Sequence, residues 1–564
     1  MITDLSPGLV LILGAALVPV FRGHLRSAYM LSLPVIAAAI ALTLPYGEHG
    51  QFELFGLTLT MVRVDGFSLI FSYVFLIAAF LSIIYSLHSK DTLQQIAGLV
   101  YAGSAIGAVF AGDFLTLFVF WEGTTVGSVI LVLASRTERS FKAGMRYLVI
   151  QIASGVFLLA GAALYYADTG SIEFGYLGLE TTAGVLIFVA FGIKCAFPFL
   201  HNWLQDAYPE STVTGAVFLS AFTTKLAVYA LARGYPGVEI LVPIGAAMTA
   251  FPIFYAVIEN DLRRVLAYSL NNQLGFMVVG IGIGTELSLN GTAAHAFCHV
   301  IYKALLFMSM GAVLYRTNTV KGSELGGLYR TMPWTAAFCI VGAASISAFP
   351  LFSGFVSKAL IIAAAIDGGY FWTWLILLFA SAGVFHHSGI KIPFFAFFAH
   401  DSGKRPPEAP KNMLFAMGIG AALCIGIGVY PEALYRILPF PVDYLPYTVE
   451  HVVTQLQLLM FSALAFTVLM RYGIYPPELR STNLDFDWFY RRLLLNLAKK
   501  ALAFGILLRA RILSVLGRQL SRVLAGLYRH HGPTGVLARS WPTGSMAFWT
   551  TFLLAAYLVL YYFE

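Results

Sequence analysis

Charged residues are scarce in this chain: they make up 11% of its 564 residues, while 59% of the residues are hydrophobic. A soluble globular protein carries about 25% charged residues. There is therefore too little polar material to cover a soluble protein of this size, and the mean hydropathy of +0.79 agrees. We interpret the chain as a multi-pass protein of the cell membrane, expected in a bacterial inner membrane.

Cysteine is also scarce, with four residues that all lie in apolar stretches: Cys195, Cys298, Cys339 and Cys424. Their spacing lacks the close pairs of a zinc or iron–sulfur site and the loop placement of a disulfide framework. Free cysteine usually behaves as a small buried hydrophobe. These residues therefore predict core positions, and no metal or cofactor is expected.

Apolar runs recur along nearly the whole chain. Runs of about 17–25 residues are long enough to cross a hydrocarbon core, and we count roughly fourteen to sixteen of them. The first follows Met1 almost directly, without a basic leader, which predicts a retained helix. Residues 45–66 are polar and predict a short ordered loop. The fold class is an all-α polytopic membrane protein.

Ionisable residues inside apolar runs are the main functional signal. Glu122 lies within an apolar run, Lys194 precedes Pro198 in FGIKCAFPFLHNWL, and Lys225 lies in a third run. An unpaired charge at the bilayer centre costs about 2.5–3.5 kcal/mol on insertion scales, and such residues mark ion pathways. A structural ion pair or a helix cap is the alternative for Glu122.

His295, His299 and Lys303 recur every four residues, so they share one face of a predicted helix. Histidine changes charge near neutral pH, and water-linked histidines can pass a proton. Two histidines at this spacing can also bind zinc, but no third ligand stands beside them, so a metal site is not favoured.

A second lysine beside proline appears at 389–393, GIKIP, where Lys391 precedes Pro393. The repeated theme predicts two related halves, each with an interrupted helix. A further Pro/Gly interruption lies at 349–361, beside Lys358. Non-helical backbone at membrane depth is tolerated where it is buried in protein or faces a watery cavity, as an ion path requires. Possible auxiliary residues are the remaining buried basic ones: Arg263, Arg264, Lys358, His386 and His387.

The loops and the tail differ in charge. Residues 136–146 carry four basic side chains and 167–180 carry three acidic ones, which places the first loop inside and the second outside. Residues 471–539 contain twelve Lys and Arg against three Asp and Glu, a net charge of +9. Within this tail the 490–530 segment predicts an amphipathic helix along the membrane interface, followed by a last span from Met546 to Tyr562. A solvated arm that binds a soluble partner is the alternative.

These motifs together resemble the antiporter-like membrane subunits shared by respiratory complex I, Mrp-type cation/proton antiporters and membrane-bound hydrogenases. The resemblance covers about residues 60–475 and is carried by FWE at Glu122, the Lys194 stretch, TKLAVYALAR, DLRRVLAYSLNNQLG and HAFCHVIYKALLF. Within the family the chain looks most like the D-type Mrp branch, whereas its tail resembles the lateral helix of complex I-like subunits.

The resemblance implies two inverted-repeat helical bundles with broken helices, a lateral helix and a closing span. The expected division is 1–94 N-terminal helices, 95–258 first bundle, 259–410 second bundle, 411–470 C-terminal helices, 471–544 lateral helix region and 545–564 terminal span. It also implies a proton relay through Glu122, Lys194, Lys225, His295, His299, Lys303 and Lys391. Arg263 or Arg264 would act electrostatically, since arginine titrates far less readily than lysine.

The function expected is proton movement in one subunit of a multi-subunit Na⁺/H⁺ antiporter, without an active site for chemistry of its own. Its partners would be other hydrophobic subunits, protons, Na⁺ and the lipid bilayer, and no nucleic acid. A proton-pumping subunit of a redox complex, a subunit of an inorganic-carbon uptake complex, and a scaffold in which buried charges only lock helices remain alternatives.

Overall fold

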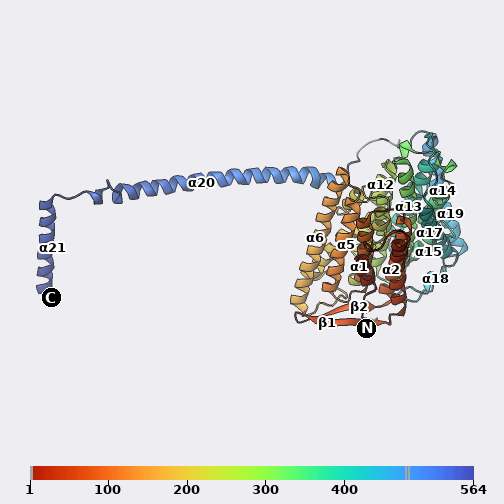
Figure 1. Ribbon diagram of the computed structural model, residues 1–564, viewed down its shortest axis with the longest axis horizontal. Helices are drawn as coiled ribbons and strands as arrows, with labels where there is room; N and C mark the ends of the chain where they lie inside the picture. Colours follow the sequence, from red (N-terminus) through yellow and green to blue (C-terminus); the bar gives the residue numbers. More distant parts are fainter. Residues whose placement is uncertain (1–3, 477–478, 480–482, 564) are drawn as a thin grey trace. The chain divides into compact units, whose positions relative to one another are not determined.

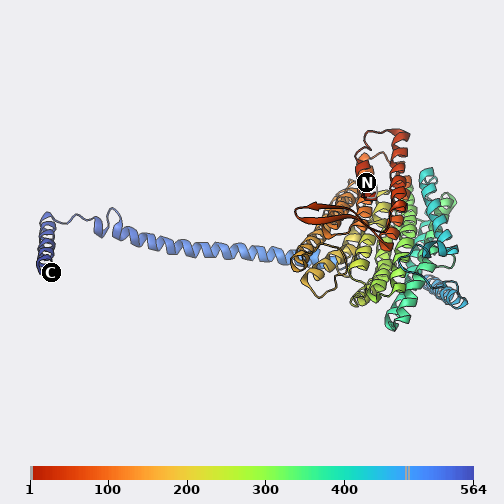
Figure 2. The ribbon, with the colours of Figure 1, turned by 90° about the horizontal axis from the view of Figure 1, so that it is seen from below.

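The computed structural model describes residues 4–476, 479 and 483–563. The chain divides into two compact units, residues 1–483 and 484–564. Each unit is helical, and the first also contains one pair of strands (Figures 1 and 2).

The first unit is built from helices that lie side by side (Figure 1). Its elements up to the middle of the chain are α1 (Pro7–Ala15), α2 (Gly23–Thr43), β1 (Gly47–Leu54), β2 (Leu57–Val64), α3 (Gly66–Ser86), α4 (Thr92–Phe110), α5 (Phe114–Leu133), α6 (Glu138–Thr169), α7 (Thr182–Cys195), α8 (Asn202–Ala207), α9 (Gly215–Ala221), α10 (Thr223–Gly234) and α11 (Leu241–Ile258). The later elements are α12 (Leu262–Ile283), α13 (Glu286–Thr317), η1 (Gly322–Glu324), η2 (Leu328–Arg330), α14 (Pro333–Ile346), α15 (Ser353–Asp367), α16 (Phe371–Val384), η3 (Phe385–Lys391), η4 (Phe394–Phe398), α17 (Lys411–Val429), α18 (Glu432–Tyr435) and α19 (Val449–Arg471).

Twelve helices within the described residues are long and apolar enough to cross a membrane, and two shorter apolar ones, α7 and α14, accompany them. The twelve spans are two fewer than the lower end of the predicted range, because α7 and α14, at 14 residues each, are too short to be counted. The four cysteines are free and buried, as predicted.

Residues 45–66 form a β-hairpin, which the sequence analysis did not foresee. β1 and β2 pair antiparallel from Gly47 opposite Val64 to Leu54 opposite Leu57. Phe55 and Gly56 make the two-residue turn, and both have positive φ, as a tight hairpin of this kind requires. The available signal was the alternation of apolar and polar residues in 57–64 around this glycine. The fold is therefore helical with one added hairpin (Figure 1).

Two helices of the first unit are broken by the same short motif. Ala196-Phe197-Pro198 follows α7, and Ala348-Phe349-Pro350 follows α14. In both breaks the alanine and the residue three positions later have positive φ: 60° and 71° in the first break, 56° and 72° in the second. Left-handed backbone ends a helix, and proline prevents its immediate continuation.

The segment around Lys391 is continuous, contrary to the predicted interruption there. A π-helical turn, η3, continues α16, and a second one, η4, follows Pro393. One apolar span therefore runs from Phe371 to Phe398. The broken helix of the second half lies about forty residues before Lys391, at 347–352. Within the described residues of this half, left-handed residues and a proline coincide at that place and not at Lys391.

The two halves also match in helix length. α6 and α13 are both 32 residues long and start 148 residues apart. The same separation joins Asp113 and Asp261, which cap α5 and α12 and each form an isolated β-bridge. The sequence therefore contains a structural repeat that begins near these two aspartates.

The repeat is inverted. Arg139, just after α5, binds Glu210, and Arg263, at the start of α12, binds the carbonyl oxygen of Ser211. α12 therefore begins on the side of the unit where α5 ends, so the two equivalent helices run in opposite directions. Inverted repeats of this kind are common in transporters.

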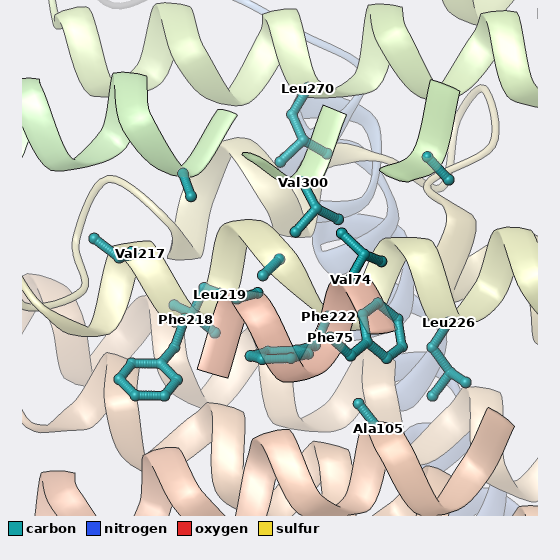
Figure 3. Close-up of a cluster of buried hydrophobic side chains, with 14 of the residues drawn as sticks. Val74, Phe75, Ala105, Val217, Phe218, Leu219, Phe222, Leu226, Leu270 and Val300 are labelled. Atoms are coloured by element: carbon teal, nitrogen blue, oxygen red, sulfur yellow. The ribbon is translucent and has the colours of Figure 1, made fainter. Parts of the chain in front are cut away.

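The core of the first unit is one cluster of buried apolar side chains that runs from Leu11 to Leu438. Val74 and Phe75 of α3 pack with Phe218, Phe222 and residues of the later helices, and Leu270 and Val300 lie close to them (Figure 3). These side chains are buried, and their apolar contacts stabilise the arrangement in a membrane through close packing.

The second unit contains η5 (Phe489–Leu494), α20 (Leu495–His531), η6 (Val536–Ala538) and α21 (Thr543–Phe563). α20 has 37 residues, about 55 Å at 1.5 Å per residue, and no acidic residue. The predicted tail helix and the predicted last span are both confirmed as helices. The six-part division of the chain stays a prediction.

Candidate functional site

Lys194 occupies the last turn of α7, just before the first break, and its side chain is fully buried. The ammonium donates hydrogen bonds to the carbonyl oxygen of Trp121 at 2.6 Å, to Thr124 Oγ1 at 2.8 Å and to Thr125 Oγ1 at 3.4 Å. It also lies 4.4 Å from the centre of the Trp121 ring. A buried charge needs such partners, and α5 supplies all of them.

Glu122 lies next to these residues on α5, but the two charges are not in contact. Within the described residues no ion pair closer than 4.0 Å joins Glu122 to Lys194, and Glu122 Oε1 is buried without a hydrogen-bond donor. A Cβ atom at Gly155 of α6 would come within 1.8 Å of that oxygen. Gly155 therefore makes the space that the carboxylate occupies, a role that only the structure reveals.

Lys225 lies at a third irregularity, between α9 and α10. Its buried ammonium donates to the carbonyl oxygen of Ser220 at 2.6 Å and to Thr224 Oγ1 at 3.2 Å. The two short helices meet at Phe222, where the backbone departs from helical geometry. The interruption frees carbonyl oxygens, and Lys225 uses one of them.

The predicted stripe on α13 is confirmed as one continuous helix. His295 Nδ1 lies 3.1 Å from Ser357 Oγ, and its Nε2 lies 3.4 Å from the Tyr302 hydroxyl. Both ring nitrogens of His299 and the ammonium of Lys303 are buried without a hydrogen-bond partner in the part of the chain that the structure describes. Buried polar atoms of this kind are normally satisfied by ordered water, so the stripe has the chemistry of a hydrated path.

Lys358 follows the second break on α15. Its ammonium donates to the carbonyl oxygen of Ile346, the last residue of α14, at 2.7 Å, and lies 5.1 Å from the centre of the Phe276 ring. The sequence analysis ranked Lys358 as auxiliary. The structure places it at the broken helix that corresponds to the one beside Lys194.

Lys391 is bound to the end of another helix. Its ammonium donates to the carbonyl oxygens of Ala256 at 3.3 Å, Val257 at 2.7 Å and Glu259 at 2.6 Å, at the C-terminus of α11. A cation is stabilised at a helix C-terminus by the helix dipole. Sequence spacing does not reveal this contact, which joins residues more than 130 positions apart.

The neighbouring histidines differ from each other. His387 Nδ1 lies 2.8 Å from Ser388 Oγ, which in turn donates to Ser269 Oγ at 2.8 Å. His386 instead packs against Phe466 and Tyr475, with ring centres 5.2 and 5.4 Å away. His387 therefore faces the polar interior, and His386 faces an aromatic cluster.

The two arginines stay at the edge of this polar series. The guanidinium of Arg263 is buried and donates to the carbonyl oxygens of Tyr208, Ser211 and Thr212. Arg264 lies 3.9 Å from Glu259. Both are engaged in holding the connection between helices, which fits an electrostatic role.

Electrostatic interactions join the predicted site residues into two groups, Glu122 with Lys194 and Lys225 with the later residues. Glu122 interacts electrostatically with Lys194, and His299 with Lys225, Lys303 and Lys358. His387 interacts with Lys303 and continues the second group toward Lys391. The five lysines are 0–1% exposed. Sequence reasoning missed the partners on α5, Trp121, Thr124 and Thr125, since only their distance to Lys194 marks them.

Among the described residues, no cluster of three or more His, Cys, Asp and Glu side chains is arranged for a metal ion.

Comparison with known proteins identifies related membrane proteins. Residues 111–385 match the family described as NADH:quinone oxidoreductase/Mrp antiporter, transmembrane. The D-type subunit of the Na⁺/H⁺ antiporter of Alkalihalophilus pseudofirmus is 32% identical over 284 residues, which cover 47% of this chain and 58% of that protein. The N-type subunit of the NADH-quinone oxidoreductase of Desulforudis audaxviator is 29% identical over 398 residues, 65% of this chain and 79% of that protein.

Two solved structures share the fold. A chain of the Mrp complex from Dietzia sp. has a TM-score of 0.66 at 21% identity and covers 77% of this chain and 91% of its own length. A chain of an archaeal membrane-bound sulfane sulfur reductase has a TM-score of 0.70 at 22% identity and covers 98% of this chain and 99% of its own length. Residues 111–385, just under half of the chain, are therefore similar to the NADH:quinone oxidoreductase/Mrp antiporter family, and twelve helices among the described residues are long and apolar enough to cross a membrane.

Proposed function

We propose that this chain is the proton-translocating subunit of a multi-subunit Mrp-type Na⁺/H⁺ antiporter. The observation that carries the proposal is the set of five buried lysines, four of which are held by carbonyl oxygens, hydroxyls and aromatic rings. A lysine in such a place can release its proton to a neighbour at moderate cost, because desolvation already disfavours its charged form. Similarity to the D-type subunit of a Na⁺/H⁺ antiporter supports the choice of ions.

The proposed path runs from Glu122 and Lys194 through Lys225, along the α13 stripe, to Lys391. Charge on one lysine disfavours charge on the next, so the groups titrate as a network and a proton that arrives at one end displaces one farther along. Lys358, at the second break, joins this network in the proposal. The chain carries the protons itself, while Na⁺ exchange is shared with the hydrophobic partner subunits.

The test is transport by the purified complex in vesicles, followed with a pH-sensitive dye after a Na⁺ pulse. Lys194→Ala should reduce Na⁺-dependent proton movement to the level of empty vesicles while the complex still assembles. Lys142→Ala is the matched control, because Lys142 is 62% exposed and pairs with Glu138 on the surface. Full transport by an assembled Lys194→Ala complex would falsify the relay.

A second candidate is the proton-pumping arm of an energy-converting redox complex. The observation in its favour is the extent of the structural match, since the sulfane sulfur reductase chain covers 98% of this chain and the Mrp chain covers 77%. Mass spectrometry and iron analysis of the complex purified in mild detergent separate the two. Small hydrophobic partners without iron support the antiporter, and iron with hydrophilic redox subunits supports the second candidate.

A further inference from the structure

An apolar groove lies on the surface of the first unit between α14 and α17, apart from the lysine series. Its volume is about 570 Å³. Seven of its eight lining residues are apolar, and Lys411 is the eighth; the apolar ones are Trp334, Phe338, Leu414, Phe415, Gly418, Ile419 and Ala422. Trp334 and Phe415 are 62% and 63% exposed, so the groove opens outward rather than into the core.

The length of the groove along α17 matches the thickness of the hydrocarbon layer of one leaflet. It follows α17 from Lys411, the first residue of that helix, to Ala422. Eleven residues of helix span about 16.5 Å at 1.5 Å per residue. Half of a hydrocarbon core of about 30 Å is about 15 Å. An acyl chain whose headgroup lies at the level of Lys411 would therefore end near Ala422.

The walls of the groove suit an acyl chain. Trp334 and Phe338 stand one turn apart on α14, with ring centres 6.3 Å apart, and form one side. Gly418 of α17 faces them: the nearest atom to a Cβ built there is Phe338 Cζ at 3.6 Å. The absence of a side chain at Gly418 leaves the groove open at its middle. Tryptophan at the mouth is typical of the membrane interface.

Lys411 gives the mouth of the groove a positive charge. Its side chain is exposed and makes no hydrogen bond or ion pair with the described residues. The acid nearest in sequence, Glu408, is already engaged, because its carboxylate accepts hydrogen bonds from the backbone N–H groups of Trp334 and Thr335. The ammonium of Lys411 therefore remains available to an anionic group in the headgroup region.

The mouth lies on the basic side of the protein. Asn412, beside Lys411, donates to the carbonyl oxygens of Ile84 and Tyr85 at the end of α3. Just beyond that end, Asp91 binds Arg136 of the basic loop 136–146. Basic loops mark the cytoplasmic side, where the leaflet carries anionic lipid.

We propose that the α14–α17 groove is a binding site for an anionic phospholipid of the cytoplasmic leaflet. One acyl chain lies along Gly418 between Phe338 and Ile419, and the phosphate lies at Lys411. A second apolar groove lies between α2, α3 and α17, lined by eleven residues that include Pro34, Tyr73 and Leu423 and none that is charged. Its lining offers no charge to select a headgroup, unlike the lining of the α14–α17 groove.

The experiment uses the full chain in nanodiscs of phosphatidylcholine that contain a few mole per cent of a brominated lipid, and it follows quenching of Trp334. Brominated phosphatidylglycerol should quench more strongly than brominated phosphatidylcholine with the same acyl chains, and the difference between the unmodified protein and Trp334→Phe isolates the signal of Trp334. One lysine near an anionic surface corresponds to about a fivefold preference. Lys411→Gln should remove that preference and leave the weaker quenching by phosphatidylcholine.

Two further variants make the result specific. Gly418→Leu fills the groove and should abolish the quenching of Trp334 that either brominated lipid causes from within it. Lys90→Gln changes an exposed lysine outside both grooves and should leave the quenching by both lipids unchanged. Equal quenching by the two lipids in the unmodified protein, or a preference that survives Lys411→Gln, would overturn the proposal. So would loss of Trp334 quenching when partner subunits are present, since a partner helix would then occupy the groove.

Discussion

α6 and α13 occupy matching places in the two halves of the first unit, and their equal length makes a position-by-position comparison possible. At the separation of 148 residues, Gln151 corresponds to His299 and Gly155 to Lys303. The first half therefore has no side chain on α6 where the second half has a lysine on α13. The preceding helices show the complementary change, because Glu122 of α5 corresponds to Leu270 of α12.

The difference has a steric reason. Glu122 Oε1 occupies the volume that any side chain at position 155 would need, so an acid on α5 excludes a larger residue on α6. In the second half an apolar residue, Leu270, lies among packed hydrophobic side chains (Figure 3), and the charge is on α13 instead. One repeated backbone thus carries an acid in one half and a base in the other.

The largest effect is expected from Glu122→Leu, which gives the first half the residue that the second half has at this position. Transport should fall to the level of empty vesicles, because the acid beside Lys194 is removed. The complex should still assemble, since leucine is tolerated at the matching place. Leu270→Met is the control and should keep transport. Normal transport by Glu122→Leu would show that the asymmetry is structural only.

The next largest effects are expected from removing the threonine hydroxyls that accept hydrogen bonds from the lysines. Thr124→Val keeps the shape of the side chain and removes a 2.8 Å hydrogen bond to Lys194. A hydrogen bond to a charged group contributes about 1.5–3 kcal/mol, so the free energy of unfolding should fall by about that amount. Thr224→Val removes a longer bond, 3.2 Å, to Lys225 and should cost less. Thermal unfolding in detergent measures both, and a larger loss for Thr224→Val would contradict this order.

Gly155→Ala tests the steric account directly. The added Cβ would meet Glu122 Oε1, and overpacking of this kind typically costs about 1–3 kcal/mol of stability. The double variant Glu122→Leu/Gly155→Ala makes the site more like that of the second half. Gly426→Ala is the control, because a Cβ there meets no atom within 4 Å. It should leave stability unchanged or raise it slightly, and a similar loss at both glycines would argue against a special role for Gly155.

The smallest effect concerns the two breaks themselves. Ala196 and Ala348 have φ values of 60° and 56°, and left-handed backbone costs a non-glycine residue about 1–2 kcal/mol. Glycine removes this cost but adds unfolded-state entropy, so each Ala→Gly change should raise stability by about 1 kcal/mol or less. Equal shifts in the melting temperature would confirm that the breaks are equivalent, and opposite signs would separate them.

Much of the candidate site was open to prediction from the sequence because its signals are local. The α13 stripe follows from a period of four residues along one helix, and Glu122 and Lys194 stand out as charges inside apolar runs. For the second half the sequence predicts interruptions at two places, at 349–361 and at Lys391, and the structure confirms only the first, because a proline in an apolar run is equally visible at both. Only the left-handed backbone at Ala348 distinguishes the true one.

The sequence by itself determined that the chain spans a membrane many times, that lysines and one acid lie inside its apolar runs and that its tail forms one long helix, since length, hydropathy and helical period are properties of neighbouring residues. Tertiary structure alone decided what those charges contact. Trp121 and Thr124 hold Lys194 from about seventy residues away, the end of α11 holds Lys391, and Gly155 makes room for Glu122. These contacts depend on which helices pack side by side, and no local pattern encodes that.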